Sequence, residues 1–238
     1  MGLYTISNEG GTLIINGGRI ENLATVSGSM YDAIDNTPTL GNTYLTINGG
    51  EIYCGYLGIR QFANSTTYEN VVTVEGGKVE GGNSAIWIQN PGSAQPKANV
   101  VITDGYVAGR ILAGESTGFS VAVSDGTFTV AVPEAFCAEG YIPTKNADGT
   151  YGVKLGKFTV RNTTTGVGYE TLAAAIAAAQ AGETIELLAD VSAAEVILIN
   201  KSITINGNGY NVTSSATRVF RVTTGNVEVT LNDVNMVS

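Results

Sequence analysis

Carboxylates are the side chains that could do acid or base chemistry in this chain, which has 21 Asp+Glu and no histidine. Asp104 and Asp125 each precede a glycine at the same corner of neighbouring repeats. If these repeats stack, the two carboxylates could approach the roughly 5–5.5 Å that separates the catalytic pair of retaining glycosidases. Asp-Gly is also a common turn dipeptide, and Asn16, Asn48 and Glu75 continue the corner column in earlier repeats. We therefore favour a turn over a catalytic dyad.

No metal and no cofactor are expected. Cys54 and Cys137 lie far apart without CxxC spacing, and the absence of histidine excludes a Cys/His zinc site. The segment 146–151 lacks the alternating carboxylates and distal glutamate of a calcium loop, so we expect a hairpin turn there. A disulfide between the two cysteines cannot be deduced from the sequence, and we favour free thiols.

A column of outward-facing residues is the best candidate for ligand binding. Asp35, Arg60 and Trp87 follow the same inward isoleucine in three successive repeats, so parallel stacking would space them about 4.8 Å apart. Arg60 beside Trp87 permits a cation–π contact, and amide and aromatic groups on adjoining loops could complete a sugar platform. The alternative, which we favour, is a surface ladder without a ligand. The tentative ligand-binding set is Asp35, Arg60, Gln61, Tyr68, Trp87 and Gln89.

An eight-residue phrase that recurs five times would position these residues. Each phrase alternates apolar and polar residues, turns at glycine, and ends on an apolar residue. The phrases begin at 13, 45, 72, 100 and 121, so their spacing varies from 21 to 32 residues. Such variation is typical of β-solenoid repeats with loops of different length. The phrases are 13–20, 45–52, 72–79, 100–107 and 121–128.

The repeats predict inward columns of apolar residues. Ile47, Val74, Ile102 and Val123 should be buried and stacked, because their columns align only in register. Glycine pairs mark the corner between the two strands of each phrase. A further strand is expected in each of four repeats, at 33–35, 58–60, 85–87 and 110–112.

The repeat pattern stops at Pro133, which predicts three segments. We expect a first β-helix unit over 1–132, a cap and connector with a hairpin over 133–157, and a second unit over 158–238. The segment 169–180 is the one expected helix, with an apolar stripe of Leu172, Ile176 and Ala179 and a stop at Gly182. Both ends of the chain look cut, so the second unit is expected to be truncated.

The second unit carries a family resemblance. The helix, then Ala-Gly-Glu-Thr-Ile-Glu-Leu at 181–187, then Lys-Ser-Ile-Thr-Ile-Asn-Gly-Asn-Gly at 201–209 resemble the N-terminal entry of the right-handed parallel β-helix, or pectin-lyase-like, superfamily. The glycine phrases and the cap also resemble repeat-rich surface proteins of gut bacteria. The resemblance implies an all-β fold, a right-handed parallel β-helix (β-solenoid) in two units in series with one short capping α-helix. The catalytic carboxylate clusters of the family have no match here.

Composition narrows the function. The net charge of −9 and pI near 4.5 argue against nucleic-acid binding, and no apolar run approaches the roughly 20 residues of a membrane span. We expect a non-catalytic extracellular or cell-surface module, an adhesin or spacer segment of a bacterial surface protein, with weak binding of a glycan or host surface ligand. A signal and an anchor are missing from this sequence. The alternatives are a fragment of a polysaccharide lyase or hydrolase, and a trimeric phage fibre segment; the oligomeric state is left open.

Overall fold

The computed structural model describes residues 4–25, 31–89, 97–114 and 118–238. The chain forms two compact units, Met1–Leu155 and Gly156–Ser238, which we call unit 1 and unit 2. The predicted boundary at 157/158 lies two residues from this division, and the segment 133–155 belongs to unit 1. Both units consist mainly of strands, so the expected all-β class is confirmed.

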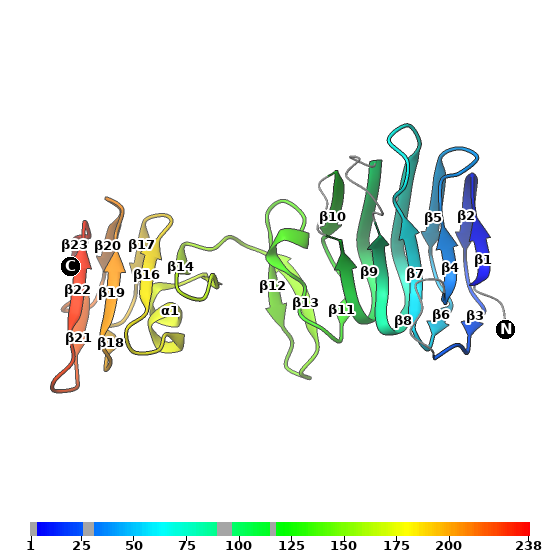
Figure 1. The fold of residues 1–238 in the computed structure, drawn as a ribbon. Helices are drawn as coiled ribbons and strands as arrows, with labels where there is room; N and C mark the ends of the chain where they lie inside the picture. Colours follow the sequence, from blue (N-terminus) through cyan, green and yellow to red (C-terminus); the bar gives the residue numbers. More distant parts are fainter. Residues whose placement is uncertain (1–3, 26–30, 90–96, 115–117) are drawn as a thin grey trace. The chain divides into compact units, whose positions relative to one another are not determined.

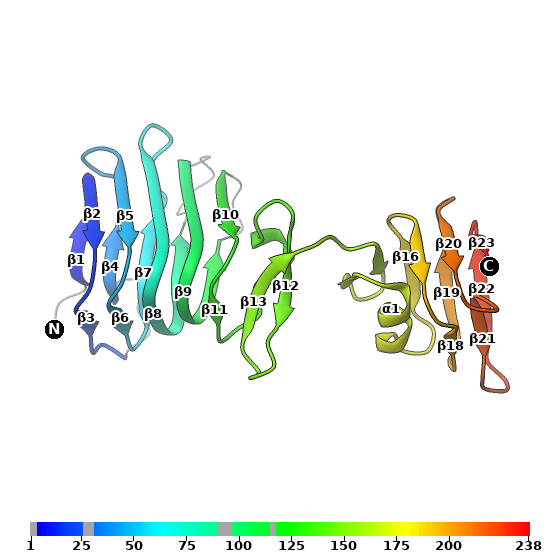
Figure 2. The ribbon, with the colours of Figure 1, turned by 180° about the vertical axis from the view of Figure 1, so that it is seen from behind.

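The strands of unit 1 follow the recurring phrases (Figures 1 and 2). The first, second and fifth phrases each give one strand before the corner and one after it, whereas the third and fourth phrases lie within the long bent strands β8 and β9. The strands are β1 (Tyr4–Asn8), β2 (Gly11–Ile15), β3 (Arg19–Asn22), β4 (Asp32–Asn36), β5 (Thr43–Ile47), β6 (Glu51–Cys54), β7 (Leu57–Phe62), β8 (Glu69–Gln89), β9 (Lys97–Ala113), β10 (Phe119–Val123) and β11 (Thr127–Phe128).

Successive phrases pair in parallel and in the expected register. Before the corner, β2 pairs with β5, β5 with β8, β8 with β9, and β9 with β10. After the corner, β3, β6, β8, β9 and β11 repeat this order. The third expected strand of each repeat also forms, and β1, β4, β7, β8 and β9 pair in parallel.

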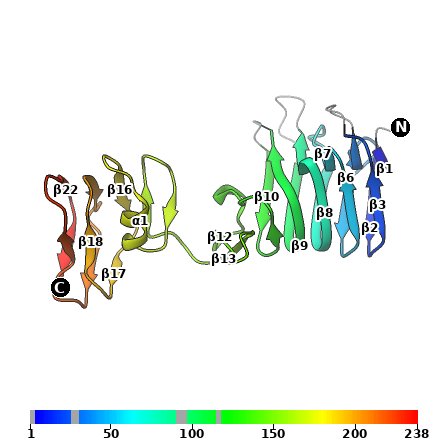
Figure 3. The same ribbon diagram turned by 90° about the horizontal axis from the view of Figure 1, so that it is seen from below.

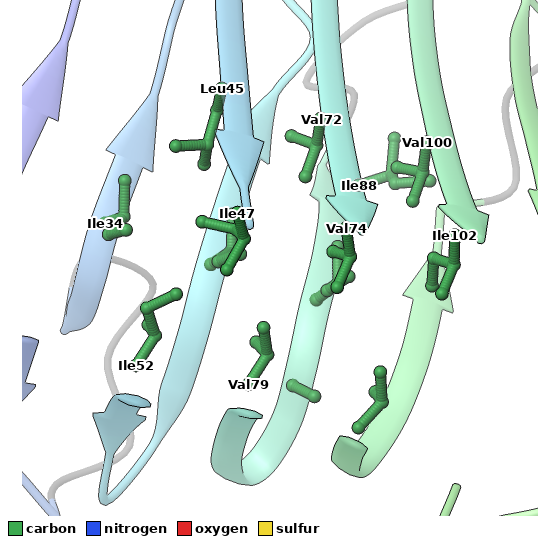
Figure 4. Close-up of a cluster of buried hydrophobic side chains, with 14 of the residues drawn as sticks. Ile34, Leu45, Ile47, Ile52, Val72, Val74, Val79, Ile88, Val100 and Ile102 are labelled. Atoms are coloured by element: carbon green, nitrogen blue, oxygen red, sulfur yellow. The ribbon is translucent and has the colours of Figure 1, made fainter. Parts of the chain in front are cut away.

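The apolar columns make the core of unit 1. Ile47, Val74, Ile102 and Val123 are fully buried, and each is the register partner of the next, which confirms the expected stacking. Figure 4 shows Ile47, Val74 and Ile102 on neighbouring strands with their side chains turned toward the same interior. Parallel pairing in register therefore places like residues against like in the core, and the register of β8 and β9 shifts only between these apolar positions.

The last part of unit 1 is an antiparallel hairpin. A short 3-10 helix (Glu134–Phe136) follows Pro133, and then β12 (Tyr141–Lys145) pairs with β13 (Tyr151–Leu155). Phe128 of β11 is the partner of Tyr151, so the hairpin pairs with the final repeat strand. The expected hairpin turn is present, because Asp148 accepts hydrogen bonds from the backbone N–H and the hydroxyl of Thr150.

Unit 2 repeats the parallel pairing after an antiparallel start. The strands β14 (Val160–Asn162) and β15 (Gly168–Tyr169) lead into β16 (Thr184–Leu187), which pairs in parallel with β19 (Ile203–Asn206), and β19 pairs with β22 (Val229–Asn232). Two further rows pair in the same way. They are β17 (Val191–Ala193), β20 (Asn211–Ser214) and β23 (Asn235–Val237), and β18 (Ile197–Ile199) with β21 (Phe220–Val222).

The expected helix is present but shorter. Helix α1 spans Leu172–Ala178, and the hydroxyl of Thr171 caps it by accepting from the N–H of Ala174 at 3.2 Å. The predicted stripe of Leu172, Ile176 and Ala179 is buried in the core of unit 2. Figure 3 shows α1 next to β16 and β17. Within the described residues, no helix is long and apolar enough to cross a membrane.

Candidate functional site

Three neighbouring strands bring the predicted column together. Asp35 on β4 is the register partner of Arg60 on β7, and Arg60 is the partner of Trp87 on β8. The order Asp35, Arg60, Trp87 across the sheet is therefore confirmed. It follows from the apolar columns, because Ile34, Ile59 and Ile86 precede these residues and fix the register.

The expectation that Asp35 and Arg60 lie on the surface is wrong. Asp35 is 4% exposed and Arg60 is 7% exposed. Side chains two residues further along the chain contact them: the Thr37 hydroxyl donates to Asp35 Oδ1 at 2.8 Å, and the Phe62 ring centroid lies 4.9 Å from the Arg60 guanidinium carbon. An outward position in a strand therefore does not give exposure here.

Arg60 joins two carboxylates. Its Nε donates to Asp35 Oδ1 at 3.0 Å and lies 3.1 Å from Asp32 Oδ2. Its aromatic partner is Phe62, so the cation–π contact expected with Trp87 is formed with a different ring. Charges removed from water must be paired and hydrogen-bonded, and one guanidinium serves both carboxylates here. We call Asp32, Asp35 and Arg60 the buried ionic cluster.

Asp32 is the member of the buried ionic cluster whose charged form is least favoured. Burial raises its pKa from 3.8 to about 7, against the opposing pull of Arg60, and the nearby charge of Asp35 raises it further. The carboxyl is inaccessible to solvent. A carboxyl that titrates near neutrality is a feature of many catalytic sites, but this one has no path to a substrate. The repeat pattern in the sequence did not indicate Asp32 as a candidate site residue.

Gln61 is also interior, which removes it from the tentative ligand-binding set as a surface group. Its Nε2 donates to the carbonyl oxygens of Asn70 and Asn99 at 2.7 and 3.0 Å. Beside it, Asn8 donates to Asn36 at 2.8 Å and Asn36 donates to Asn70 at 2.7 Å between side chains. These interior amides tie one repeat to the next.

The hydrogen-bonded side chains of Asn8 and Asn36 have a signal in the sequence. The strands β1 and β4 read Tyr-Thr-Ile-Ser-Asn and Asp-Ala-Ile-Asp-Asn, so both end on the same Ile-x-Asn pattern. Asparagine at the end of stacked strands can hydrogen-bond to its equivalent in the next repeat, because the equivalents lie about 4.8 Å apart.

Three residues of the tentative ligand-binding set keep contact with solvent. Tyr68 is exposed, and Trp87 and Gln89 are half-buried. Gln89 Oε1 accepts a long hydrogen bond of 3.5 Å from Arg60. The structure thus splits the set into a buried half (Asp35, Arg60, Gln61) and an accessible half, and ligand binding by the accessible half stays a prediction.

The carboxylates of the predicted corner serve turns. Asp104 Oδ1 accepts from the N–H of Gly105 at 2.6 Å, and Asp125 Oδ1 accepts from the N–H of Gly126 at 2.7 Å. Both side chains are thus bound to the backbone of their own turns, as an Asp-Gly turn requires. A search of the described residues finds no group of three or more His, Cys, Asp or Glu side chains that could hold a metal ion.

The cysteines are separate free thiols. Cys54 is buried, and burial raises its pKa; its Sγ lies 3.3 Å from the carbonyl oxygen of Tyr31. Burial, with the charge of Glu134, raises the pKa of Cys137 to about 11. Neither thiol is activated as a nucleophile, because a raised pKa keeps it protonated at neutral pH.

A groove in unit 2 offers another concave surface. It has a volume of about 370 Å³ and lies between α1 and the segment 191–198. Glu195 is the single ionisable residue among its lining side chains. One carboxylate does not make the acid and base pair that glycoside hydrolysis requires.

Comparison of the chain with protein-family models, with curated proteins and with solved structures gave no match. The resemblance to the pectin-lyase-like superfamily and to bacterial surface proteins therefore stays a prediction.

Proposed function

We propose that this chain is a non-catalytic module whose repeats wind as a right-handed parallel β-helix. We further propose that it serves outside the cell or at the bacterial surface as a spacer or adhesin segment. The parallel, in-register pairing of successive repeats in both units supports the β-helix. The surface location rests on the family resemblance and on the acidic composition with few charged residues.

The observation that carries the proposal is the burial of the best candidate site. Asp35 and Arg60 are the charged residues of the tentative set, and they bind each other inside the stack. Gln61 and the ladder of Asn8, Asn36 and Asn70 likewise bind neighbouring repeats. Polar groups used in this way hold a rod of repeats together and leave none of these atoms for a substrate.

Weak glycan binding is the second candidate function. Tyr68, just before β8, and Trp87 and Gln89, near its end, remain accessible, and accessible aromatic rings with amide groups suit sugar faces. A lyase or hydrolase fragment has less support, because neither the buried ionic cluster nor the corner aspartates offer a free acid and base pair. A phage fibre would be trimeric, which sedimentation can detect.

A glycan panel read for both binding and cleavage tests the proposal. We expect no release of reducing or unsaturated sugar ends from pectin, polygalacturonate or other acidic glycans. Any binding should be weak and should disappear in Trp87→Ala with an unchanged circular dichroism spectrum. Leu198→Ala, an exposed apolar residue in unit 2, is the matched control and should leave binding unchanged. Release of sugar ends that Asp104→Asn or Asp125→Asn abolishes would overturn the non-catalytic proposal.

A further inference from the structure

One row of strands in unit 1 stops at the end of β9. The segment 110–113 of β9 pairs with β8 on one side, and among the described strands none pairs with its other side. Gly114 donates its N–H to the Ile88 carbonyl oxygen at 3.1 Å, on the β8 side. Since backbone groups point to alternate sides along a strand, those of Ile111 and Ala113 face the unpaired side. We call residues 110–113 the β9 edge.

The repeat that follows β9 covers its other two parts and leaves the β9 edge without a neighbouring strand. β10 pairs with residues 98–102, and β11 pairs with residues 106–107 (Figure 1). After Phe128 the chain forms no third strand: residues 129–132 are irregular, and the 3-10 helix follows Pro133. The β9 edge is therefore open because the repeat pattern stops at Pro133, with the hairpin and unit 2 still to follow.

The inward isoleucine column loses its cover at the β9 edge. Ile34, Ile59 and Ile86 are fully buried. They pair in register across β4, β7 and β8, and the next partner is Ile111. Ile111 packs against the core but is only half-buried. A side chain from one more strand would cover Ile111 and gain the hydrophobic stabilisation that the inner isoleucines already have.

An apolar pocket lies beside Ile111. It has a volume of about 120 Å³ and lies between the start of the β9 edge and the chain that follows β11. Ile111, Phe128 and Val132 are among its lining residues, and Arg110 is the single charged one. A pocket of this size and apolar character holds one aliphatic side chain of a strand placed beside the β9 edge.

Arg110 gives the β9 edge a positive charge. Its side chain is exposed and donates to Asn83 Oδ1 at 3.0 Å, and among the described residues it forms no salt bridge with a carboxylate. Elsewhere in unit 1 the register partners Arg19 and Glu51 form such a pair at 3.6 Å. A carboxylate opposite Arg110 on an added strand would make the same kind of cross-strand pair.

We propose that an extended segment of another protein binds the β9 edge as an additional parallel strand, with an acidic residue opposite Arg110 and an aliphatic residue next to it, opposite Ile111. The parallel direction continues the row of β1, β4, β7, β8 and β9. Backbone hydrogen bonds give such a contact its affinity, and the pocket and Arg110 give it specificity. This contact uses no residue of the tentative ligand-binding set, so it is independent of glycan binding.

Fluorescence anisotropy of a labelled peptide, titrated with the full chain, tests the contact. The probe is the blocked peptide Ser-Glu-Ile-Thr-Val-Ser, which in parallel register places its Glu opposite Arg110 and its Ile opposite Ile111. We expect saturable binding. The peptide with the reverse order, Ser-Val-Thr-Ile-Glu-Ser, should bind about fivefold more weakly or worse, because its carboxylate would lie opposite Ala113, away from Arg110.

Two substitutions locate the binding site. Ile111→Lys should raise the dissociation constant about tenfold or more, because it removes the apolar contact beside the pocket. Ile14→Lys is the matched control, since Ile14 is 55% exposed on β2, and it should leave binding unchanged. Arg110→Glu should weaken binding of the probe about fivefold, and a peptide with Lys in place of Glu should restore it.

The charge exchange at Arg110 decides the matter if Ile111→Lys has an altered circular dichroism spectrum, because Arg110 is exposed and its replacement leaves the core intact. The absence of saturable binding, equal binding of the two peptide orders, or a charge exchange without effect would each overturn the proposal. Binding that a folded Ile111→Lys variant leaves unchanged would do the same. Self-association of the full chain that is lost in Arg110→Glu would assign the β9 edge to a second copy and overturn the choice of partner.

Discussion

Burial and charge oppose each other at Asp32. The carboxyl is inaccessible to solvent and shares Arg60 with Asp35, which is the better hydrogen-bonded of the two. Removing one of two carboxylates leaves the guanidinium with a partner, whereas removing the guanidinium would leave two buried carboxylates unpaired. The buried ionic cluster therefore holds more negative charge than its interior position favours.

Asp32→Asn should make stability less dependent on pH. The raised pKa means that the folded state holds a proton that the unfolded state has lost, so wild-type stability falls as pH rises from about 4 through about 7. Asparagine has a similar shape without the charge. Relative to the wild type, the variant should gain free energy of unfolding between pH 5 and pH 8, by at most about 3 kcal/mol.

Urea denaturation of both proteins at pH 5 and pH 8 measures this gain. Asp35→Asn is the comparison, because it replaces the charged acceptor of Arg60 and Thr37 by a weaker neutral one and should lower stability at both pH values. If Asp32→Asn lowered the free energy of unfolding relative to the wild type by the same amount at pH 8 as at pH 5, the carboxylate would be a net stabilising partner of Arg60.

At the scale of elements, backbone corners decide which substitutions the repeats tolerate. Gly77 lies at the corner within β8 with φ +71°, and a Cβ there would lie 2.7 Å from the backbone of Gly49 and Gly50 in the neighbouring repeat. Gly18, the equivalent residue of the first phrase, has a similar φ of +82°, but a Cβ there would meet nothing within 4 Å. The two glycines therefore share a left-handed backbone conformation, and only Gly77 is also in close contact with a neighbouring repeat.

Gly77→Ala should destabilise unit 1 by roughly 1–3 kcal/mol, because both the backbone conformation and the close approach of the neighbouring repeat exclude a side chain. Gly18→Ala should cost less, about 1 kcal/mol, because only the left-handed backbone conformation is strained there. Thermal denaturation followed by circular dichroism compares the two variants. Equal effects would mean that the corner conformation, without the contact between repeats, determines the cost.

The sequence predicted elements better than it predicted exposure. Ile47, Val74 and Ile102 could be placed because period-two alternation and a repeated corner fix both face and register. The burial of Arg60 could not, because it depends on side-chain contacts with Phe62 and with the carboxylates of Asp32 and Asp35, which no periodicity describes. The helix was predicted too long for a related reason: tertiary contacts decide where a short alanine-rich helix ends.

At the scale of the whole molecule, the chain contains two separate hydrophobic cores. The unit 1 core includes Ile102 and the unit 2 core includes Ile176, and both side chains are almost completely buried. Each repeat is stabilised chiefly by contacts with its neighbours, so each core should unfold as its own cooperative unit. Trp87 is the only tryptophan in the chain and lies in unit 1, which makes its fluorescence a reporter of that unit alone.

In dilute solution, a cavity in one core should therefore shift the denaturant unfolding transition of its own unit only. Ile102→Ala and Ile176→Ala each remove a buried isoleucine side chain, at a cost of about 2–5 kcal/mol. Ile102→Ala should shift the tryptophan fluorescence transition to lower denaturant. Ile176→Ala should leave that transition in place and shift only part of the far-ultraviolet circular dichroism change, because the dichroism reports both units. If Ile176→Ala moved the fluorescence midpoint as far as Ile102→Ala does, the two cores would be unfolding as one, and their stabilities would have to be coupled through the segment that joins β13 to β14.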